Sequence, residues 1–392
     1  MTIVLSGFLN DIIKRWGKVL MYKRYLLNCT TNNVGGAVQN SVNFIKHLHQ
    51  NGLENDWYFF LSKEVYIQVE NLLLDSYEVI DSPAKNFKAR RFIRTRQKDL
   101  KPTLVYTTAG PAYVDFDCLH IMGCSNPYIL GANSLSKKYL RSHFERIGRE
   151  LHTLYQRFHI RKADKWLVQT EDSLNQLASL GIKKRDCSII YNSISSDFKK
   201  SYEQSNKAST DTIDLDSVVR ILVPSAYYKH KNLEIVPFVL GELTKRGVKA
   251  IITLTTSDSE SIRNIYQQAK LLGVENRIVN IGPFEHSEAV TIYESHDLIL
   301  QPSLLEVFST SYIEAMALLK PLVVPDLNFS RGICENYPVY YQAGNAISCA
   351  DSILSALRKQ NNKELAGRLL SIYGDQESRF QNIMNVINDY KG

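Results

Sequence analysis

The feature that most constrains this sequence is an alternation of short apolar runs with longer amphipathic stretches, which occurs twice along 392 residues. In the first half, amphipathic stretches such as Ala37–Gln50 and Leu135–Ala163 have a helical pattern. The apolar runs are the expected strands, namely Tyr22–Cys29, Trp57–Leu61, Thr103–Thr107, Cys118–Met122, Lys165–Gln169 and Cys187–Tyr191. Strands that alternate with helices favour a parallel, doubly wound sheet.

The pattern restarts after a polar stretch, Ser195–Ser217, which has the composition of a linker or long loop. The expected strands of the second half are Arg220–Val223, Ala250–Leu254, Arg277–Ile281, Leu298–Gln301 and Leu322–Val324. The expected helices between them are Leu233–Arg246, Ser259–Leu272, Ser287–Ser295 and Ser311–Leu319. We therefore predict an α/β protein with two Rossmann-like domains facing each other across a cleft, where ligands of such sheets bind.

The predicted organisation has five parts. They are an N-terminal extension (1–20), a first domain (21–195), a linker (196–217), a second domain (218–374) and a C-terminal helix packing back on the first domain (375–392). The extension has apolar residues at helical spacing, and its charges come late, unlike those of a signal peptide. Two interpretations stay open: an amphipathic surface anchor, or upstream sequence translated from a wrong start, since Met21 begins a natural-looking N-terminus.

Composition indicates the expected partner and cellular compartment. The net charge of +7 suggests an anionic partner. The six cysteines are scattered without a CxxC pair, which favours reduced thiols in a cytosolic protein. No run of about 20 apolar residues predicts a transmembrane helix. We expect a cytoplasmic protein, with peripheral contact to the inner face of the membrane as an open alternative.

The most informative stretch is Asp297–Pro321, which predicts a buried strand, a loop and a helix. Ser309 or Thr310 is suited to cap the helix N-terminus. The free N–H groups and the positive dipole end of that terminus suit a phosphate. Glu306 before the helix and Glu314 within it are on the order of 10 Å apart along the axis. One carboxylate can therefore meet a sugar while the other meets a ribose.

This stretch resembles the retaining glycosyltransferases of family 4, which have the two-domain B-type fold. The family pattern of Glu, seven residues, Glu, Ala-Met-Ala and Pro is matched by Glu306, Glu314, Ala315-Met316-Ala317 and Pro321. The resemblance implies that Glu306 contacts the donor sugar as a catalytic residue and that Glu314 binds the ribose hydroxyls. It also implies that backbone N–H groups face the sugar and phosphate, those of Val307, Phe308 and Ser309. The first domain would bind the acceptor and the second the nucleotide sugar.

Two further segments resemble donor-binding loops of this family. Gly35 and Gly36 match its glycine-rich turn before the first helix, although a plain turn is the alternative. Lys231 matches the lysine that grips the donor's diphosphate. The accompanying arginine is missing, because its position falls on Ser225 or Ala226. Lys229 or His230 would have to compensate, or the donor is held differently.

Four more residues take their expected roles from the resemblance. Gly282 and Phe284 belong to a loop whose backbone contacts the nucleotide base. His120 follows an apolar run and is either a catalytic histidine in the cleft or a hydrogen-bonded core residue. Asn192 lies at the end of the first domain and is expected to be structural.

Metal and cofactor signals are weak. Asp115-Phe-Asp117 and Asp214-Leu-Asp216 have the Asp-x-Asp form, but three-residue matches are frequent by chance. No zinc spacing, Walker loop or GxGxxG turn is present. We expect no metal and no cofactor, with the phosphate charge met by Lys231 and a helix N-terminus.

The segment Lys85–Lys101 carries eight cations and one acid, with Phe87, Phe92 and Ile93 between them. Three interpretations stay open: a solvated helix face, an anionic membrane surface carrying a lipid-linked acceptor, or nucleic acid, for which no recognised motif is present. We expect no nucleic-acid partner.

The function expected from these patterns is transfer of a sugar from a nucleotide sugar to a hydroxyl of a glycan or lipid-linked acceptor, with retained configuration, in surface polysaccharide assembly. The alternatives are a nucleotide-sugar epimerase or another enzyme of this fold, and a non-catalytic protein that docks on membranes.

Overall fold

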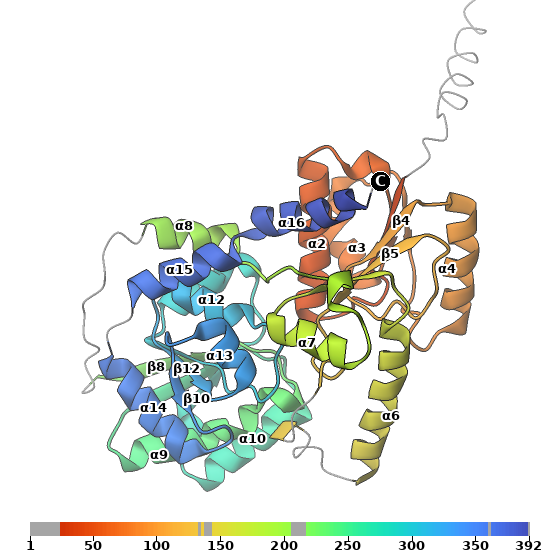
Figure 1. Cartoon of the computed structure of the whole chain (residues 1–392). Coiled ribbons are helices and arrows are strands. Elements are labelled where there is room, and N and C mark those ends of the chain that lie inside the picture. Colours follow the sequence, from red (N-terminus) through yellow and green to blue (C-terminus); the bar gives the residue numbers. More distant parts are fainter. Residues whose placement is uncertain (1–23, 132–134, 137–142, 205–216, 360–361, 391–392) are drawn as a thin grey trace, which may run out of the picture. The chain divides into compact units, whose positions relative to one another are not determined.

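The protein contains two parallel β-sheets, each flanked by helices (Figure 1). The computed structural model describes residues 24–131, 135–136, 143–204, 217–359 and 362–390. The first sheet has seven strands in the order β3-β2-β1-β4-β5-β6-β7, and the second has six in the order β10-β9-β8-β11-β12-β13. This confirms the predicted class, two parallel-sheet α/β domains.

The first sheet contains every strand expected from the first half of the sequence. Its strands are β1 (Tyr25–Asn28), β2 (Trp57–Leu61), β3 (Tyr77–Val79), β4 (Leu104–Thr107), β5 (Leu119–Cys124), β6 (Lys165–Val168) and β7 (Cys187–Ile189). The α-helices of this half are α2 (Gly35–Gln50), α3 (Lys63–Val69), α4 (Phe87–Leu100), α6 (His143–Ile160) and α7 (Glu171–Ser179). All four residues of β1 are buried, because this strand pairs with β2 on one side and β4 on the other. A strand covered on both faces reads as one continuous apolar run.

The second sheet also contains every expected strand, together with β13, which the sequence did not predict. Its strands are β8 (Val219–Val223), β9 (Ala250–Leu254), β10 (Ile278–Asn280), β11 (Leu298–Leu300), β12 (Leu322–Pro325) and β13 (Val339–Tyr341). The helices of this half are α8 (Ser196–Gln204), α9 (Val236–Lys245), α10 (Glu260–Leu271), α11 (Ala289–Glu294), α12 (Thr310–Ala317), α13 (Asn328–Cys334), α14 (Ala346–Arg358), α15 (Lys363–Tyr373) and α16 (Gln376–Asp389).

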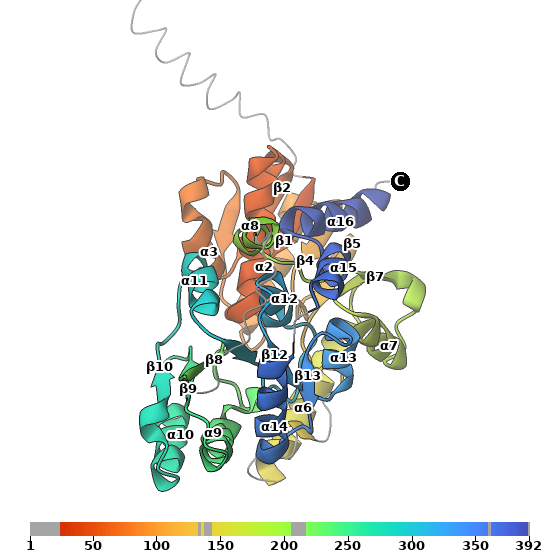
Figure 2. The ribbon, with the colours of Figure 1, turned by 90° about the vertical axis from the view of Figure 1, so that its left-hand side faces the viewer.

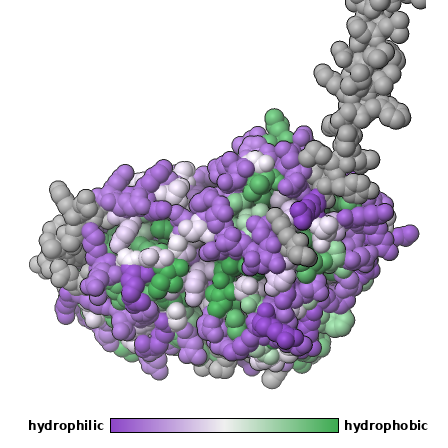
Figure 3. Space-filling model, turned by 45° about the horizontal axis from the view of Figure 1, so that its top comes forward, coloured by the Kyte–Doolittle hydropathy of each residue, from purple (hydrophilic) through white to green (hydrophobic). Residues whose placement is uncertain are grey.

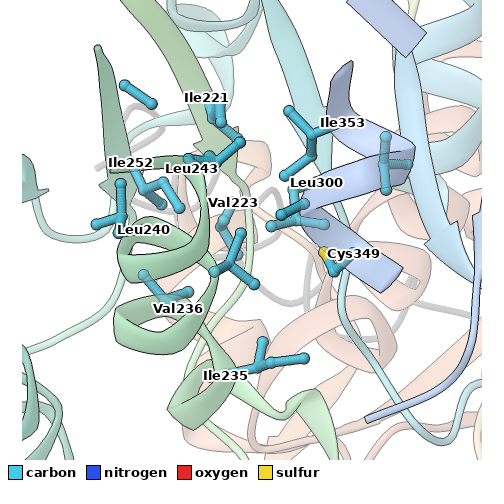
Figure 4. Packing of buried hydrophobic residues seen from close by; sticks show 14 of the residues in the cluster. Ile221, Val223, Ile235, Val236, Leu240, Leu243, Ile252, Leu300, Cys349 and Ile353 are labelled. Carbon is cyan, nitrogen blue, oxygen red and sulfur yellow. The ribbon is translucent and has the colours of Figure 1, made fainter. Parts of the chain in front are cut away.

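The second sheet buries a core on each face. Ile221 and Val223 of β8 pack into a cluster with α9, α10 and α14, whereas Leu222 packs into a cluster with α8, α12 and α15. This alternation follows from the period of two along a strand. Figure 4 shows part of the first cluster, with side chains of β8 and β9 meeting those of α9 and α14. Figure 2 shows α10, α9 and α14 in a row along that face.

By its contacts the chain divides into two compact units. The first runs up to Cys124 and includes His159–Trp166, and the second comprises Ser125–Phe158 and the chain from Leu167 onward. The predicted boundaries of the domains and the packing of the C-terminal helix stay predictions.

The prediction of a loop across the polar stretch Ser195–Ser217 is wrong in its first part. Residues Ser196–Gln204 form α8, whose Phe198 is fully buried and meets the ring of Tyr293 edge-on at 5.3 Å. One apolar side chain thus anchors a helix whose other residues are polar enough to read as linker. Residues 205–216 lie outside the described part of the chain.

The surface of the described residues is mixed. Figure 3 shows a face on which hydrophilic side chains predominate and hydrophobic ones gather in separate patches. Within the described ranges, no helix combines the length and the apolar character needed to cross a membrane. The expected N-terminal extension, residues 1–20, lies outside the described part of the chain.

Candidate active site

The loop between β11 and α12 is held in place by hydrogen bonds to a neighbouring loop. Leu304 N–H donates to the carbonyl of His230 at 2.7 Å, and Asn232 Nδ2 donates to the carbonyl of Pro302 at 3.4 Å. Both partners belong to the loop after β8, which is the carboxyl end of the neighbouring strand in the sheet. The predicted donor-binding loops of this unit therefore lie side by side.

Lys231 and Glu306 form an ion pair at this junction. Lys231 ends the short 3₁₀ helix Lys229–Lys231, and its Nζ donates to Glu306 Oε1. The side chains retain only 16% and 11% of their exposure. Both residues were predicted to contact the donor, and the structure brings them together. The two charges are thus mostly buried, and each compensates the other.

The N-terminus of α12 follows directly. Ser309 is its N-cap in extended conformation, but no side chain caps the helix and no acidic residue occupies its first turn. The Ser309 hydroxyl instead lies 2.7 Å from that of Ser311, and Gln301 Nε2 donates to both hydroxyls at 3.2 and 2.9 Å. The first N–H groups of the helix are thus without a side-chain cap, as an anion site requires.

The side chains of Val307 and Phe308 are buried, each 7% exposed. The Phe308 carbonyl accepts a hydrogen bond from Asn192 Nδ2 at 3.3 Å, and Asn192 Oδ1 accepts one from Gln169 Nε2 at 3.0 Å. Asn192, expected to be structural, thus fixes the loop that carries the candidate site. The roles predicted for the backbone N–H groups of Val307, Phe308 and Ser309 stay predictions.

Glu314 has a different partner from Glu306. Its Oε2 accepts a hydrogen bond from the hydroxyl of Tyr293 in α11 at 2.6 Å. Burial raises the pKa of the Glu314 carboxyl, and the hydrogen bond from Tyr293 partly offsets this. The two carboxylates of the motif therefore sit in distinct surroundings, one beside a cation and one beside a phenol.

The loop after β10 is also ordered by side-chain contacts. Gly282 has φ of +76°, which favours glycine, and its N–H donates to Asn280 Oδ1 at 3.3 Å. Asn280 Oδ1 also accepts the N–H of Thr256 at 3.1 Å. Phe284 packs, partly buried, against the core cluster that contains α12. The structure thus links the predicted base-contacting loop to the helix of the motif.

His120 lies in the first unit, on β5, and is 2% exposed. Its Nδ1 lies 3.2 Å from the carbonyl of Lys162, which can only accept, so Nδ1 carries the proton. Its Nε2 then accepts from the hydroxyl of Thr107 at 2.8 Å. Burial lowers the pKa of His120 to about 4, which the carbonyl of Lys162 partly counteracts. The side chain has the surroundings expected of a neutral core histidine, the second of its two predicted roles.

Gly35 and Gly36 also belong to the first unit and begin α2. Gly35 has φ of +61°, and a Cβ at either glycine would meet nothing within 4 Å. The first turn of α2 carries no acid, and its N-cap Val34 provides no side-chain bond. The turn is therefore open, as a loop that approaches a ligand must be. His120, Gly35 and Gly36 lie in one unit and the other predicted residues in the second.

Among the residues that the structure describes, no group of three or more His, Cys, Asp or Glu side chains is arranged to hold a metal ion. Asp115 of the first Asp-x-Asp motif instead pairs with Lys162 at 3.0 Å. The second motif, at Asp214, lies outside the described ranges.

Two residues near the candidate site carry no sequence motif and were missed. Tyr128 contacts His230, with the Tyr128 hydroxyl 3.2 Å from Nδ1, and the guanidinium of Arg149 lies 4.6 Å from the centre of the Tyr128 ring. Tyr128 lies 102 residues before the histidine that it contacts, and Arg149 reaches the site only through Tyr128, so the fold alone reveals them.

Comparisons with known proteins agree with this geometry. Residues 217–369 match the family model described as glycosyl transferases group 1. No curated protein sequence matches the chain. Among solved structures, a glycosyltransferase from Rickettsia africae aligns with a TM-score of 0.68 and 15% identity, over 93% of this chain and 98% of that one.

Two further structures are similar to the same extent. Anabaena HepE in complex with UDP and glucose aligns with a TM-score of 0.65 and 16% identity, over 93% of this chain and 99% of that one. The lipopolysaccharide outer core galactosyltransferase WaaB aligns with a TM-score of 0.64 and 14% identity, over 93% and 99%. At such identities the likeness shows the B-type fold. Together with the glycosyl transferases group 1 match over residues 217–369, this fold indicates a glycosyltransferase.

Proposed function

We propose that this protein transfers a sugar from a nucleoside diphosphate sugar to a hydroxyl of a glycan or lipid-linked acceptor. The configuration of the sugar is retained, and the reaction belongs to surface polysaccharide assembly. The observation that supports the proposal best is the Lys231–Glu306 pair beside the uncapped end of α12, inside the region that matches the family model.

In the proposed reaction, the donor's diphosphate binds Lys231 and the first N–H groups of α12, and Glu306 turns to the sugar. The bond between the anomeric carbon and the phosphate oxygen breaks, and the acceptor oxygen bonds to that carbon on the same face. The acceptor's proton passes to the leaving phosphate oxygen. Charge stabilisation by Lys231 and the helix end assists departure, without a protein nucleophile or a metal.

Glu314 is proposed to bind the ribose. Its carboxylate oxygens are acceptors suited to the two ribose hydroxyls, and Tyr293 holds the group in a fixed rotamer. The loop of Gly282 and Phe284 is proposed to contact the base through its backbone. The complex of HepE with UDP and glucose supports a nucleoside diphosphate sugar as the class of donor.

A product analysis with a panel of nucleotide sugars tests this proposal. We expect release of a nucleoside diphosphate with one donor and an α-linked product from an α-linked donor, read from the anomeric proton by NMR. A product of inverted configuration would contradict retention. Conversion of the donor to an isomer without release of nucleotide would indicate an epimerase. Absence of turnover by the wild-type protein with every donor would favour a non-catalytic role.

We further propose that α4 docks this enzyme on an anionic membrane surface. The helix buries Ala89, Arg90, Ile93 and Gln97, and its opposite face exposes Phe87 and Phe92, which retain 78% and 46% of their exposure. That face also carries cations, namely Lys88, Arg91, Arg94 and Lys98. Exposed aromatics between cations match the interface of an anionic bilayer.

Sedimentation with vesicles tests the docking. We expect binding to phosphatidylglycerol vesicles and little binding to phosphatidylcholine vesicles, with each cation near the surface contributing about 1 kcal/mol. Arg91→Glu with Lys98→Glu should release the protein, whereas Lys270→Glu, an exposed reversal on α10, should not. Equal binding to both lipids, or no loss in the double variant, would contradict the proposal.

A further inference from the structure

The candidate diphosphate site contains less positive charge than its sequence suggests. The positive charge of Lys231 is compensated by Glu306, and Lys229 Nζ lies 3.4 Å from Glu145 Oε1 on α6. Burial lowers the pKa of His230 to about 4, so this residue is neutral at physiological pH. None of the three basic residues after β8 therefore supplies an uncompensated charge to a diphosphate, which carries at least two negative charges.

An uncompensated cation comes from α6 instead. Glu145, Arg149 and Gln156 are spaced by four and seven residues, so they lie along one side of this helix. Glu145 reaches Lys229 and Gln156 is buried, so this side faces the protein. The opposite side carries exposed apolar residues, among them Phe144, Leu151 and Phe158. Arg149 thus lies on the side of α6 that faces the rest of the second unit, to which Ser125–Phe158 belongs.

The guanidinium of Arg149 is held over an aromatic ring. It lies 4.6 Å from the centre of the Tyr128 ring, a distance at which cation–π attraction holds it in place. Tyr128 meets His230 edge-on, with ring centres 5.7 Å apart, and its hydroxyl lies 3.2 Å from His230 Nδ1. His230 directly precedes Lys231, so Arg149 is two contacts from the Lys231–Glu306 pair.

Arg149 is also available to a ligand. Arg149 is exposed, and no carboxylate in the described part of the chain pairs with its guanidinium. A guanidinium presents a planar fork of donors that matches phosphate oxygens, and stacking on Tyr128 reduces the entropy lost on binding.

We infer that Arg149, positioned by Tyr128 and His230, is the second cation that binds the donor's diphosphate. The inference rests on the proposed donor site of Lys231 and α12. The loop after β8 lacks the expected diphosphate-binding arginine, and the inference assigns that role to an arginine of α6. A phosphate bridging Lys231 and Arg149 would release Glu306 to the sugar.

Calorimetric titration with UDP, uridine and inorganic pyrophosphate tests this role. We expect Arg149→Ala to weaken UDP and pyrophosphate about tenfold or more while uridine binding is unchanged. Arg149→Lys should recover part of the loss, because it keeps the charge without the fork. Tyr128→Leu should weaken UDP binding less than Arg149→Ala does. Tyr128→Phe keeps the ring and should weaken UDP binding least of the three.

Arg146→Ala is the matched control, because Arg146 is an exposed arginine of the same helix. It should bind UDP as the wild type does, and thermal unfolding should show that all variants fold. If the wild type binds UDP and Arg149→Ala binds it with equal affinity, the role of Arg149 is overturned and the proposed function stays intact. A wild type that binds neither UDP nor any other nucleoside diphosphate would overturn both.

Discussion

The two units bury polar groups in different ways. In the first unit, Thr107 and His120 form a neutral network in which both ring nitrogens have a protein partner. In the second unit, Lys231 and Glu306 form a charged pair that is mostly buried. The neutral network is complete without a ligand. The charged pair is a hydrogen-bonded salt bridge, and in the proposed function a diphosphate or a sugar takes the place of one partner.

The first network extends further into the fold. Asn28 Nδ2 donates to Thr107 Oγ1 at 3.1 Å, while Asn28 Oδ1 accepts from the hydroxyl of Thr30 at 2.8 Å. Each of these groups is buried, so loss of one member leaves another without a partner. The difference teaches that burial of a polar residue at a strand end is no sign of catalysis in itself. What matters is whether its partners belong to the protein.

The largest effect is expected from Glu306→Gln. The substitution keeps the shape but removes the charge that is proposed to meet the sugar. We expect the turnover number with the preferred donor to fall about a hundredfold or more. Thermal unfolding checks that the variant still folds, because it leaves the charge of Lys231 uncompensated. Steady-state release of nucleoside diphosphate measures the loss.

Glu260→Gln is the control for this variant, because Glu260 is an exposed acid of the same unit. Its turnover should equal that of the wild type. Retained turnover in Glu306→Gln would break the comparison, since the charged pair would then be as structural as the network of His120.

The next largest effect is expected on folding. His120→Leu removes the ring nitrogens and leaves the buried Thr107 hydroxyl and the Lys162 carbonyl without this partner. We expect the unfolding free energy of the first unit to fall by about 2–4 kcal/mol. Trp57 and Trp166 both lie in this unit, so their fluorescence during urea unfolding reports the change. Lost turnover with unchanged stability would instead establish the catalytic role first expected for His120.

A third effect concerns pH and sharpens the same contrast. The pKa of His120 is about 4 in the folded chain and about 6.5 in an unfolded one. Between these values the unfolded chain binds more protons, so stability falls as the pH falls through this window. His120 alone should remove about 2 kcal/mol between pH 7.5 and pH 5.

The measurement is urea unfolding at the two pH values, again by tryptophan fluorescence. The wild type should lose more stability on acidification than His120→Leu does. His159 in the same unit also has a pKa lowered to about 4 by burial, so the variant keeps part of the dependence. Equal losses in the two proteins would show that the His120 ring is charged, or solvated, in the folded state.

Most of the fold followed from the sequence because buried parallel strands are apolar along their whole length. The strands that were missed, β3 and β13, are three-residue edge strands. Tyr77–Val79 has no fully buried residue, so it lacks the apolar run by which the others were recognised. An edge strand has one neighbour only, β2 for β3 and β12 for β13, so less of it is buried and its sequence pattern is weaker.

The candidate site divides in the same way. Lys231, Glu306 and Glu314 could be predicted because each belongs to a local motif in a strand–loop–helix. The meeting of Lys231 with Glu306 could not, since it joins loops 75 residues apart. Arg149 and Tyr128 could not be predicted either, because stacking of a side chain on a ring leaves no spacing in the sequence.

The smallest effect is expected from Tyr293→Phe, which tests whether the second carboxylate of the motif is held for the ribose. The variant removes the hydroxyl that donates to Glu314 and little else. Without this bond the carboxyl keeps its buried surroundings but loses a fixed rotamer, so UDP should bind about threefold more weakly. A 2′,3′-dideoxy analogue of UDP should bind the variant and the wild type equally, because it lacks the hydroxyls that Glu314 would accept. Tyr202→Phe, a hydroxyl removed from α8 in the same unit, serves as the control. If the deoxy analogue is weakened as much as UDP, Tyr293 acts on the packing of α11 and not on the ribose, and Glu314 then resembles His120 more than Glu306.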